Sequence, residues 1–500
     1  MIVDDPEQDG EDRRRYDRVT VLWNGKLLYP FGGGCGTNYN QGSASPSSVL
    51  RDNALSRGFA VATTSLNVLG HICNPVLSAE TVMMLKERIV EQYGEIRYTM
   101  GQGGSGGAIG QLTVTNSYPG LLQGLVPTAT FPDVLTTGAP VLDCDLLLYY
   151  FNATSPHLWT NPDHRIAVDG FGPAGSSCLA WLFSFVPVSD PTSGCGNDPA
   201  DDYDPVFNPD GCRATTQDIQ VSIWGRRPQD NFAKLAYDNT GVLYGFNAVN
   251  DGIISVEQFL DLNEQIGGID IDKNFVPQRR LADPETPLIG HFTGQANDGN
   301  GLASAAIIDI PGFFNFEIHT PYHAFRMEER LVRTHGHGDN HAIWRGGNSG
   351  LAFETMDQWL TTIEANTTGN PLHVKVVKNR PASAIDSCFI GGVQTTDQAA
   401  CDAAWPVFAD PRIAAGAPLA SDTLQCTLKP LDPNDFDVSF SPTEWGRLQA
   451  EFPGGVCDWS QLGTDQVLSK QWLTFENGPG GKPLGPAPKS KPVPRRRGGQ

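Results

Sequence analysis

The sequence predicts an α/β fold in which a mostly parallel sheet is covered by helices on both faces. Short apolar segments alternate with helical segments over residues 1–133, and the alternation returns over residues 301–369. A glycine-rich turn with a serine at its centre joins one apolar strand to one helix. Apolar strands that alternate with helices are typical of a parallel sheet buried on both sides.

The first part of the chain supplies the clearest alternation. Apolar residues at helical spacing, with Ser78 as the expected N-cap and Gly94 as the stop, predict one of its helices. The expected elements are a strand over 27–31, a helix over 48–57, a strand over 59–65, a helix over 78–93, a strand over 96–100, a helix over 108–116 and a strand over 121–130.

The turn at residues 103–107 is the most informative motif. It reads Gly-Gly-Ser-Gly-Gly, a G-x-S-x-G pattern between a strand and a helix, which is typical of a nucleophilic serine held on a sharp turn. Side chains two residues before or after Ser105 would collide with neighbouring backbone, which explains the glycines. A flexible loop or a phosphate-binding turn is the alternative. The overlapping G-x-G-x-x-G pattern lacks the later acidic residue that dinucleotide binding requires.

Composition restricts the class of protein. The 500 residues carry a net charge of −21, which argues against binding to nucleic acid or to an anionic membrane surface. No run of 18 apolar residues predicts a membrane span. The chain opens with an acidic segment rather than a signal peptide, which we interpret as a processed end or a fragment boundary.

The ten cysteines predict a disulfide set and therefore an oxidising compartment, extracellular or periplasmic. None has the C-x-x-C spacing of a zinc site, so we expect no metal on these residues. Three expected pairs join cysteines that lie close in the sequence: Cys195–Cys212, Cys388–Cys401 and Cys426–Cys457. Cys35 and Cys73 are both expected near the same edge of the sheet and form the fourth pair, which leaves Cys144–Cys178 as the fifth.

Residues 134–300 break the alternation, because Pro, Gly, Asp and aromatic residues are frequent and the helical pieces look short. We interpret this segment as a lid inserted between two sheet strands. An acidic loop at 197–210 could bind a structural Ca²⁺, although a solvated loop is the preferred interpretation. The aromatic residues of the lid would line a substrate site or form its core: Trp159, Phe171, Trp181, Phe183, Phe185 and Trp224.

The sheet pattern resumes after the lid. A strand over 304–310, a helix over 321–335, a last strand over 341–344 and a final helix over 351–365 complete the expected core. Residues 370–477 would form a disulfide-stapled appendage. The Gly-, Pro-, Lys- and Arg-rich tail at 478–500 is typical of disorder.

Together these features resemble the α/β-hydrolase superfamily, and more narrowly a family of secreted bacterial α/β-hydrolases with an uncharacterised domain. More distantly they resemble tannases, feruloyl esterases and polyester-oligomer hydrolases. The supporting motifs are the serine turn together with Phe31-Gly-Gly-Gly-Cys-Gly36, Glu317-Ile-His-Thr320, Ala414-Ala-Gly-Ala-Pro-Leu-Ala420 and Phe452-Pro-Gly-Gly-Val-Cys-Asp458. The resemblance covers most of residues 17–476 and implies an α/β-hydrolase fold and ester hydrolysis.

The resemblance makes Ser105 the nucleophile. It makes the N–H of Gly106 one oxyanion donor and that of Gly33, Gly34 or Cys35 the second.

The base and the acid are open. We favour His319, because it follows the carboxyl end of a strand, where ligands bind in open α/β sheets. His341 begins a strand and should lie toward the other edge; His323 and His71 are further alternatives. Asp309 is the favoured acid, with Glu317 and Asp133 as alternatives.

The sequence therefore predicts a secreted serine esterase that forms an acyl-enzyme and needs no organic cofactor. We expect a small or oligomeric ester, bulky, aromatic or polyester in character. A serine peptidase or amidase on the same fold is one alternative. A binding protein that retains the fold without catalysis is another. The sequence does not indicate an oligomeric state.

Overall fold

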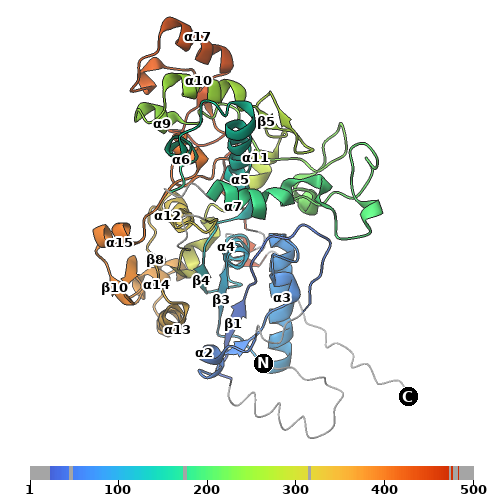
Figure 1. Cartoon of the computed structure of the whole chain (residues 1–500). Helices are drawn as coiled ribbons and strands as arrows, with labels where there is room; N and C mark the ends of the chain where they lie inside the picture. Colours follow the sequence, from blue (N-terminus) through green and yellow to red (C-terminus); the bar gives the residue numbers. More distant parts are fainter. Residues whose placement is uncertain are drawn as a thin grey trace.

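The computed structural model describes residues 23–43, 49–172, 177–312 and 317–471, and two short paired strands, β13 (Phe475–Glu476) and β14 (Lys482–Pro483). Its centre is an eight-stranded sheet in the order β10-β9-β8-β7-β4-β3-β1-β2 (Figure 1). All neighbours pair in parallel except β9 and β10. The strands are β1 (Lys26–Pro30), β2 (Ala60–Val61), β3 (Tyr98–Gly104), β4 (Gly124–Thr128), β7 (Ala306–Asp309), β8 (His341–Arg345), β9 (Ser387–Ile390) and β10 (Val393–Thr395).

Helices bury both faces of this sheet. Successive residues of one strand point to opposite faces, and the core clusters follow that rule. Leu125 joins Leu27 and Ile307 in a cluster with α3 (Pro75–Tyr93), α4 (Gly106–Ser117) and α12 (Tyr322–His335). Val126 joins Leu28 and Ile308 in a cluster with α13 (Ser349–Ala365). The predicted α/β fold with a mostly parallel, two-sided sheet is confirmed.

Three expected elements differ from the structure. Helix α3 begins after Asn74, whose side chain accepts the N–H groups of Val76 and Leu77, so Ser78 lies inside the helix rather than capping it. The expected helix at 48–57 is reduced to α2 (Asp52–Leu55), and Ser48 lies outside the described residues. The strand expected to be last is followed by β9 and β10, which continue the sheet. The predicted tail at 478–500 lies outside the described residues apart from β14.

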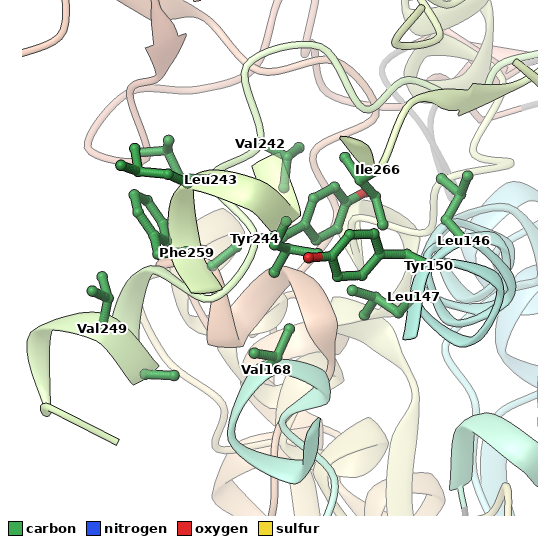
Figure 2. Packing of buried hydrophobic residues seen from close by; sticks show 14 of the residues in the cluster. Leu146, Leu147, Tyr150, Val168, Val242, Leu243, Tyr244, Val249, Phe259 and Ile266 are labelled. Atoms are coloured by element: carbon green, nitrogen blue, oxygen red, sulfur yellow. The ribbon is translucent and has the colours of Figure 1, made fainter. Parts of the chain in front are cut away.

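The long connection between β4 and β7 contains a longer helix than the sequence pattern suggested. Helix α5 (Val134–Tyr149) is capped by Asp133, whose carboxylate accepts the N–H of Thr136. Leu146 and Leu147, in the last turn of this helix, and Tyr150, which follows it, pack into an apolar cluster that the insertion shares with the C-terminal segment (Figure 2). The other helices of the insertion are α6 (Pro162–Asp169), α7 (Ser177–Ser184), α8 (Val221–Trp224), α9 (Phe246–Asn250), α10 (Val256–Gln265) and α11 (Thr286–Phe292).

A buried carboxylate fixes α5 within this insertion. Asp143 accepts hydrogen bonds from the hydroxyls of Tyr237 and Tyr244 at 2.7 and 2.6 Å, and it pairs with Arg412 at 2.7 Å. Because Arg412 lies in α16 (Pro411–Ala414), this pair ties the C-terminal part of the chain to the insertion.

The C-terminal segment therefore packs on the insertion as well as extending the sheet. Helix α17 (Pro442–Glu451) lies beside α10 in the upper part of the molecule (Figure 1). Arg447 of α17 forms ion pairs with Glu257 and Glu264 of α10. The remaining C-terminal elements are α14 (Leu372–Lys378), α15 (Gln398–Ala404), β11 (Leu428–Lys429) and β12 (Val456–Cys457).

All five expected disulfides are present: Cys35–Cys73, Cys144–Cys178, Cys195–Cys212, Cys388–Cys401 and Cys426–Cys457. Cys144 and Cys178 join α5 to α7, so this bond fixes two helices of the insertion to each other. Within the described ranges, no helix is long and apolar enough to cross a membrane.

Candidate active site

Ser105 stands alone between β3 and α4 in a strained backbone conformation. Its φ is 58° and its ψ is −124°, a region that side-chain-bearing residues rarely adopt. Its N–H donates to the carbonyls of Thr128 and Ala129, at 3.0 and 3.2 Å, which anchors the turn to the end of β4. Although serine commonly caps helices, this side chain makes no capping bond. Its hydroxyl is therefore left for another partner.

The surrounding glycines are required by close backbone contacts, as the sequence suggested. A Cβ on Gly103 or on Gly107 would lie 2.5 or 2.6 Å from the carbonyl oxygen of Phe31, at the end of β1. A Cβ on Gly106 would lie only 1.9 Å from the carbonyl oxygen of Gly34. The turn and the glycine-rich loop after β1 therefore touch through their backbones.

This contact places the loop after β1 beside the serine turn. In the described part of the chain, the N–H groups of Gly33, Gly34, Cys35 and Gly106 donate to no other residue, and Gly34, Cys35 and Gly106 line one cavity with Ser105. Gly106 is the first residue of α4, where the helix dipole favours negative charge. The loop that carries Gly34 is held by the disulfide between Cys35 and Cys73. Free N–H groups beside a nucleophile can stabilise an oxyanion.

His319 lies in the loop between β7 and α12 and is held by Glu317. The Nδ1 atom of His319 lies 2.9 and 2.8 Å from the two carboxylate oxygens of Glu317, and its backbone N–H donates to the same carboxylate at 3.1 Å. Its Nε2 atom is buried and bonds to no other described residue. A carboxylate on Nδ1 fixes the tautomer in which Nε2 can accept a proton.

Phe131 connects this histidine to a cavity beside Ser105. Its ring centroid lies 5.2 Å from that of His319, and its side chain lines the same cavity as Ser105. Ile318 packs in one buried cluster with Phe131 and Trp181, which also line the cavity. The loop that carries His319 therefore packs against the wall of the cavity that contains Ser105.

Asp309, the acid favoured from the sequence, has other partners. It accepts a hydrogen bond from Thr130, and its carboxylate lies 3.4 Å from Nε2 of His341. His341 begins β8 opposite Ile307, fully buried. Asp309 lies two residues further along β7 on the same face, so it meets His341 instead of His319. The expectation that Asp309 is the carboxylate partner of His319 is therefore wrong, because the hydrogen bonds show that Glu317 is that partner.

Asp133, the third carboxylate considered as the acid, has a structural role. Its carboxylate caps α5 and pairs with Arg330 of α12 at 2.8 Å, and both side chains are fully buried. Arg330 also donates to the carbonyls of Asn297 and Ala420. These bonds join the start of α5, α12 and the C-terminal segment behind the site.

The other two histidines considered as the base, His323 and His71, also have structural contacts. His323 is buried against Phe131, and Arg326 donates to its Nδ1 at 3.1 Å. Burial, with a contribution from the charge of Arg326, lowers the pKa of His323 well below its usual value. His71 lies 2.7 Å from the carbonyl oxygen of Ser65, near the Gly34 loop.

The aromatic residues of the insertion have different surroundings. Trp181 and Phe185 line the cavity beside Ser105, and Trp224 lines a neighbouring cavity. Trp159 and Phe171 are buried in the core, whereas Phe183 is 80% exposed.

Sequence reasoning missed the wall contributed by α5. Val134, Thr137, Gly138 and Val141 line the cavity, at the spacing of one helical face. That spacing was the available signal; it was obscured because the whole insertion was interpreted as irregular.

The acidic loop uses its carboxylates locally. Asp198, Asp202 and Asp204 each accept backbone N–H groups within or near the loop. In the ranges that the structure describes, no three metal-capable side chains come together. The solvated loop stays the preferred interpretation from the sequence, with calcium binding as its alternative.

No curated protein matches the chain. A family described as "Tannase-like family of unknown function (DUF6351)" matches residues 1–468, nearly the whole sequence. With its α/β sheet, its strained serine turn and this match, the chain belongs to that tannase-like family.

Proposed function

We propose that this protein is a secreted serine esterase of the α/β-hydrolase type, with Ser105, His319 and Glu317 as its triad. The observation that carries the proposal is the strained Ser105, set beside an apolar cavity and two free backbone N–H groups. The tannase-like family indicates an esterase-type hydrolase. The five disulfides support an oxidising compartment.

In the proposed reaction, Ser105 Oγ attacks the ester carbonyl while Nε2 of His319 takes the hydroxyl proton. Glu317 stabilises the imidazolium through Nδ1. The N–H groups of Gly34 and Gly106 would donate to the oxyanion, together with the positive end of the α4 dipole. The tetrahedral intermediate then collapses. The C–O bond to the alcohol breaks, and His319 returns the proton to the departing oxygen.

The second half of the reaction releases the acid. Water enters after the alcohol has left, and His319 now takes a proton from that water. The hydroxide attacks the acyl-enzyme carbonyl, and Ser105 leaves with the proton restored. The chemistry needs no redox partner. The hydroxyl proton of Ser105 leaves with the alcohol, and the proton that His319 takes from water replaces it on Ser105.

Parallel assays with p-nitrophenyl esters and p-nitroanilides test this function. We expect wild type to hydrolyse the esters much faster than the anilides, and Ser105→Ala to lose this activity with an unchanged melting temperature. Faster anilide cleavage would make the protein an amidase or peptidase. Equal rates for wild type and Ser105→Ala would refute a serine mechanism.

A further inference from the structure

The cavity beside Ser105 shares a wall with a second cavity. Val134, Gly138, Leu142 and Thr216 line both. Resting on the proposed function, we infer that the two cavities form one acyl-binding site. Its substrate is an uncharged ester with an apolar acyl chain and a neutral hydrogen-bonding group at the far end of that chain.

The first cavity fits the apolar part of such an acyl group. Side chains from α4, α5 and the insertion make its wall almost entirely hydrocarbon or aromatic: Ile109, Phe131, Val141, Trp181, Phe185 and Val188. Removing apolar surface from water is favourable at roughly 25 cal/mol per Å². An aliphatic chain or an unsubstituted ring attached to the carbonyl is therefore bound well here.

The second cavity offers neutral polar groups. Gln217, Gln220 and Gln295 line it. The Oε1 atom of Gln220 is buried and bonds to no described residue, and a buried acceptor without a partner is costly. A hydroxyl or an amide N–H on the substrate would satisfy this acceptor, and the amides of Gln217 and Gln295 offer further neutral donors and acceptors.

The absence of charged residues from the described lining of both cavities disfavours ionised substrates. No Asp, Glu, Lys, Arg or His is among the described residues that line either cavity. A carboxylate or ammonium group in such a site would lose its hydration without gaining a counterion. The site therefore favours a neutral distal group over an ionised one.

Gly138 lines both cavities. It lies within α5, and a Cβ added to it would meet no heavy atom within 4 Å. A leucine at this position would therefore start in open space and narrow the region that the two cavities share. Glycine within a helix costs roughly 0.5–1 kcal/mol relative to alanine, so its replacement is compatible with folding.

We assign the acyl group, rather than the alcohol, to these cavities from the order of the reaction. The acyl group stays bonded to Ser105 through both half-reactions, whereas the alcohol leaves before water attacks. Contacts in the cavities act on both half-reactions only if the acyl group makes them.

The test measures kcat/KM with four p-nitrophenyl esters that share one leaving group: acetate, octanoate, ω-hydroxyoctanoate and the suberate monoester, which ends in a carboxylate. For wild type we expect ω-hydroxyoctanoate to exceed octanoate by roughly three- to tenfold, the effect of one neutral hydrogen bond. We expect the suberate monoester to be at least tenfold poorer than ω-hydroxyoctanoate.

Gly138→Leu should lower the octanoate-to-acetate ratio by roughly tenfold or more, within the range that a single hydrophobic pocket contact controls. Gln217→Leu should reduce the preference for ω-hydroxyoctanoate over octanoate. Gly446→Ala is the matched control, because Gly446 lies on the exposed face of remote helix α17 with no atom near its would-be Cβ.

An unchanged octanoate-to-acetate ratio in Gly138→Leu would overturn the inference while leaving the proposed esterase intact. So would a preference for the suberate monoester over ω-hydroxyoctanoate. A wild type that hydrolyses none of the four esters would refute the proposed function and this inference together.

Discussion

Replacing Gly106 by alanine should disable the site by moving an oxyanion donor. The added Cβ would lie 1.9 Å from the carbonyl oxygen of Gly34 and 2.9 Å from its nitrogen. Real Cβ contacts essentially never fall below 3.0 Å, so the Gly34 loop must retreat by about 1.1 Å, the difference between 3.0 and 1.9 Å.

The loop has little room to retreat. The N–H of Gly36 donates to Leu69 at 2.8 Å, the N–H of Gly70 donates to Gly33 at 2.8 Å, and the Cys35–Cys73 disulfide closes the loop. The substitution therefore either displaces the N–H of Gly34 from the oxyanion or strains the turn that carries Ser105.

Loss of one oxyanion donor costs about 100- to 1000-fold in kcat, or about 2.7–4 kcal/mol. We expect a loss of this size for Gly106→Ala in a p-nitrophenyl ester assay, with Gly446→Ala as the control for an added methyl group. A kcat of Gly106→Ala within threefold of wild type would refute the assignment of Gly34 and Gly106 as the donors.

Three other predictions follow from buried or paired groups. Glu317→Gln should lower kcat by about 10⁴-fold, as loss of the triad acid does, whereas Asp309→Asn should mainly lower the melting temperature. A large loss of kcat in Asp309→Asn, with little loss in Glu317→Gln, would identify Asp309 as the acid instead. Arg330→Met should lower the free energy of unfolding by about 3–5 kcal/mol, because it leaves Asp133 buried without its partner, and urea unfolding that shows less than 1 kcal/mol would contradict this. His323 has a lowered pKa in the folded state, so its contribution to stability is present above the unfolded value of about 6.5 and is lost as pH falls below it. His323→Gln should therefore reduce the loss of unfolding free energy between about pH 7.5 and about pH 5.5 by about 1 kcal/mol, and an equal loss in both proteins would contradict the burial argument.

The sequence was most informative where one physical rule determines the structure. Consecutive apolar residues in the strands, such as Leu27 and Leu28, implied a sheet buried on both faces. In the structure, Leu27 lies in the core cluster on one face and Leu28 in the cluster on the other. The glycines around Ser105 implied close backbone contacts, and the carbonyl of Phe31 provides them.

The spacing of residues in the sequence could not show which of two carboxylates pairs with His319. Asp309 and Glu317 are both carboxylates near His319 in sequence. Only the pairing of β7 with β8 shows that Asp309 meets His341. Strands β9 and β10 were missed because they are short, and because they follow a helix that looked like the end of the core.

The α5 wall of the cavity was missed for a different reason. Its lining residues have the spacing of one helical face, but a glycine and a threonine among them weaken the apolar signal of that spacing. Its role depends on which neighbours leave space beside it, which is a property of the packed chain rather than of the segment.

The most direct test of the proposed mechanism is covalent labelling with a fluorophosphonate, followed by peptide mass analysis. We expect wild type to carry the label on Ser105 and Ser105→Ala to carry none. His319→Gln should label far more slowly than wild type, whereas His341→Gln, compared under conditions where both variants are folded, should label at nearly the wild-type rate. Labelling of Ser105→Ala at the wild-type rate, or normal labelling of His319→Gln together with its loss in His341→Gln, would contradict the account.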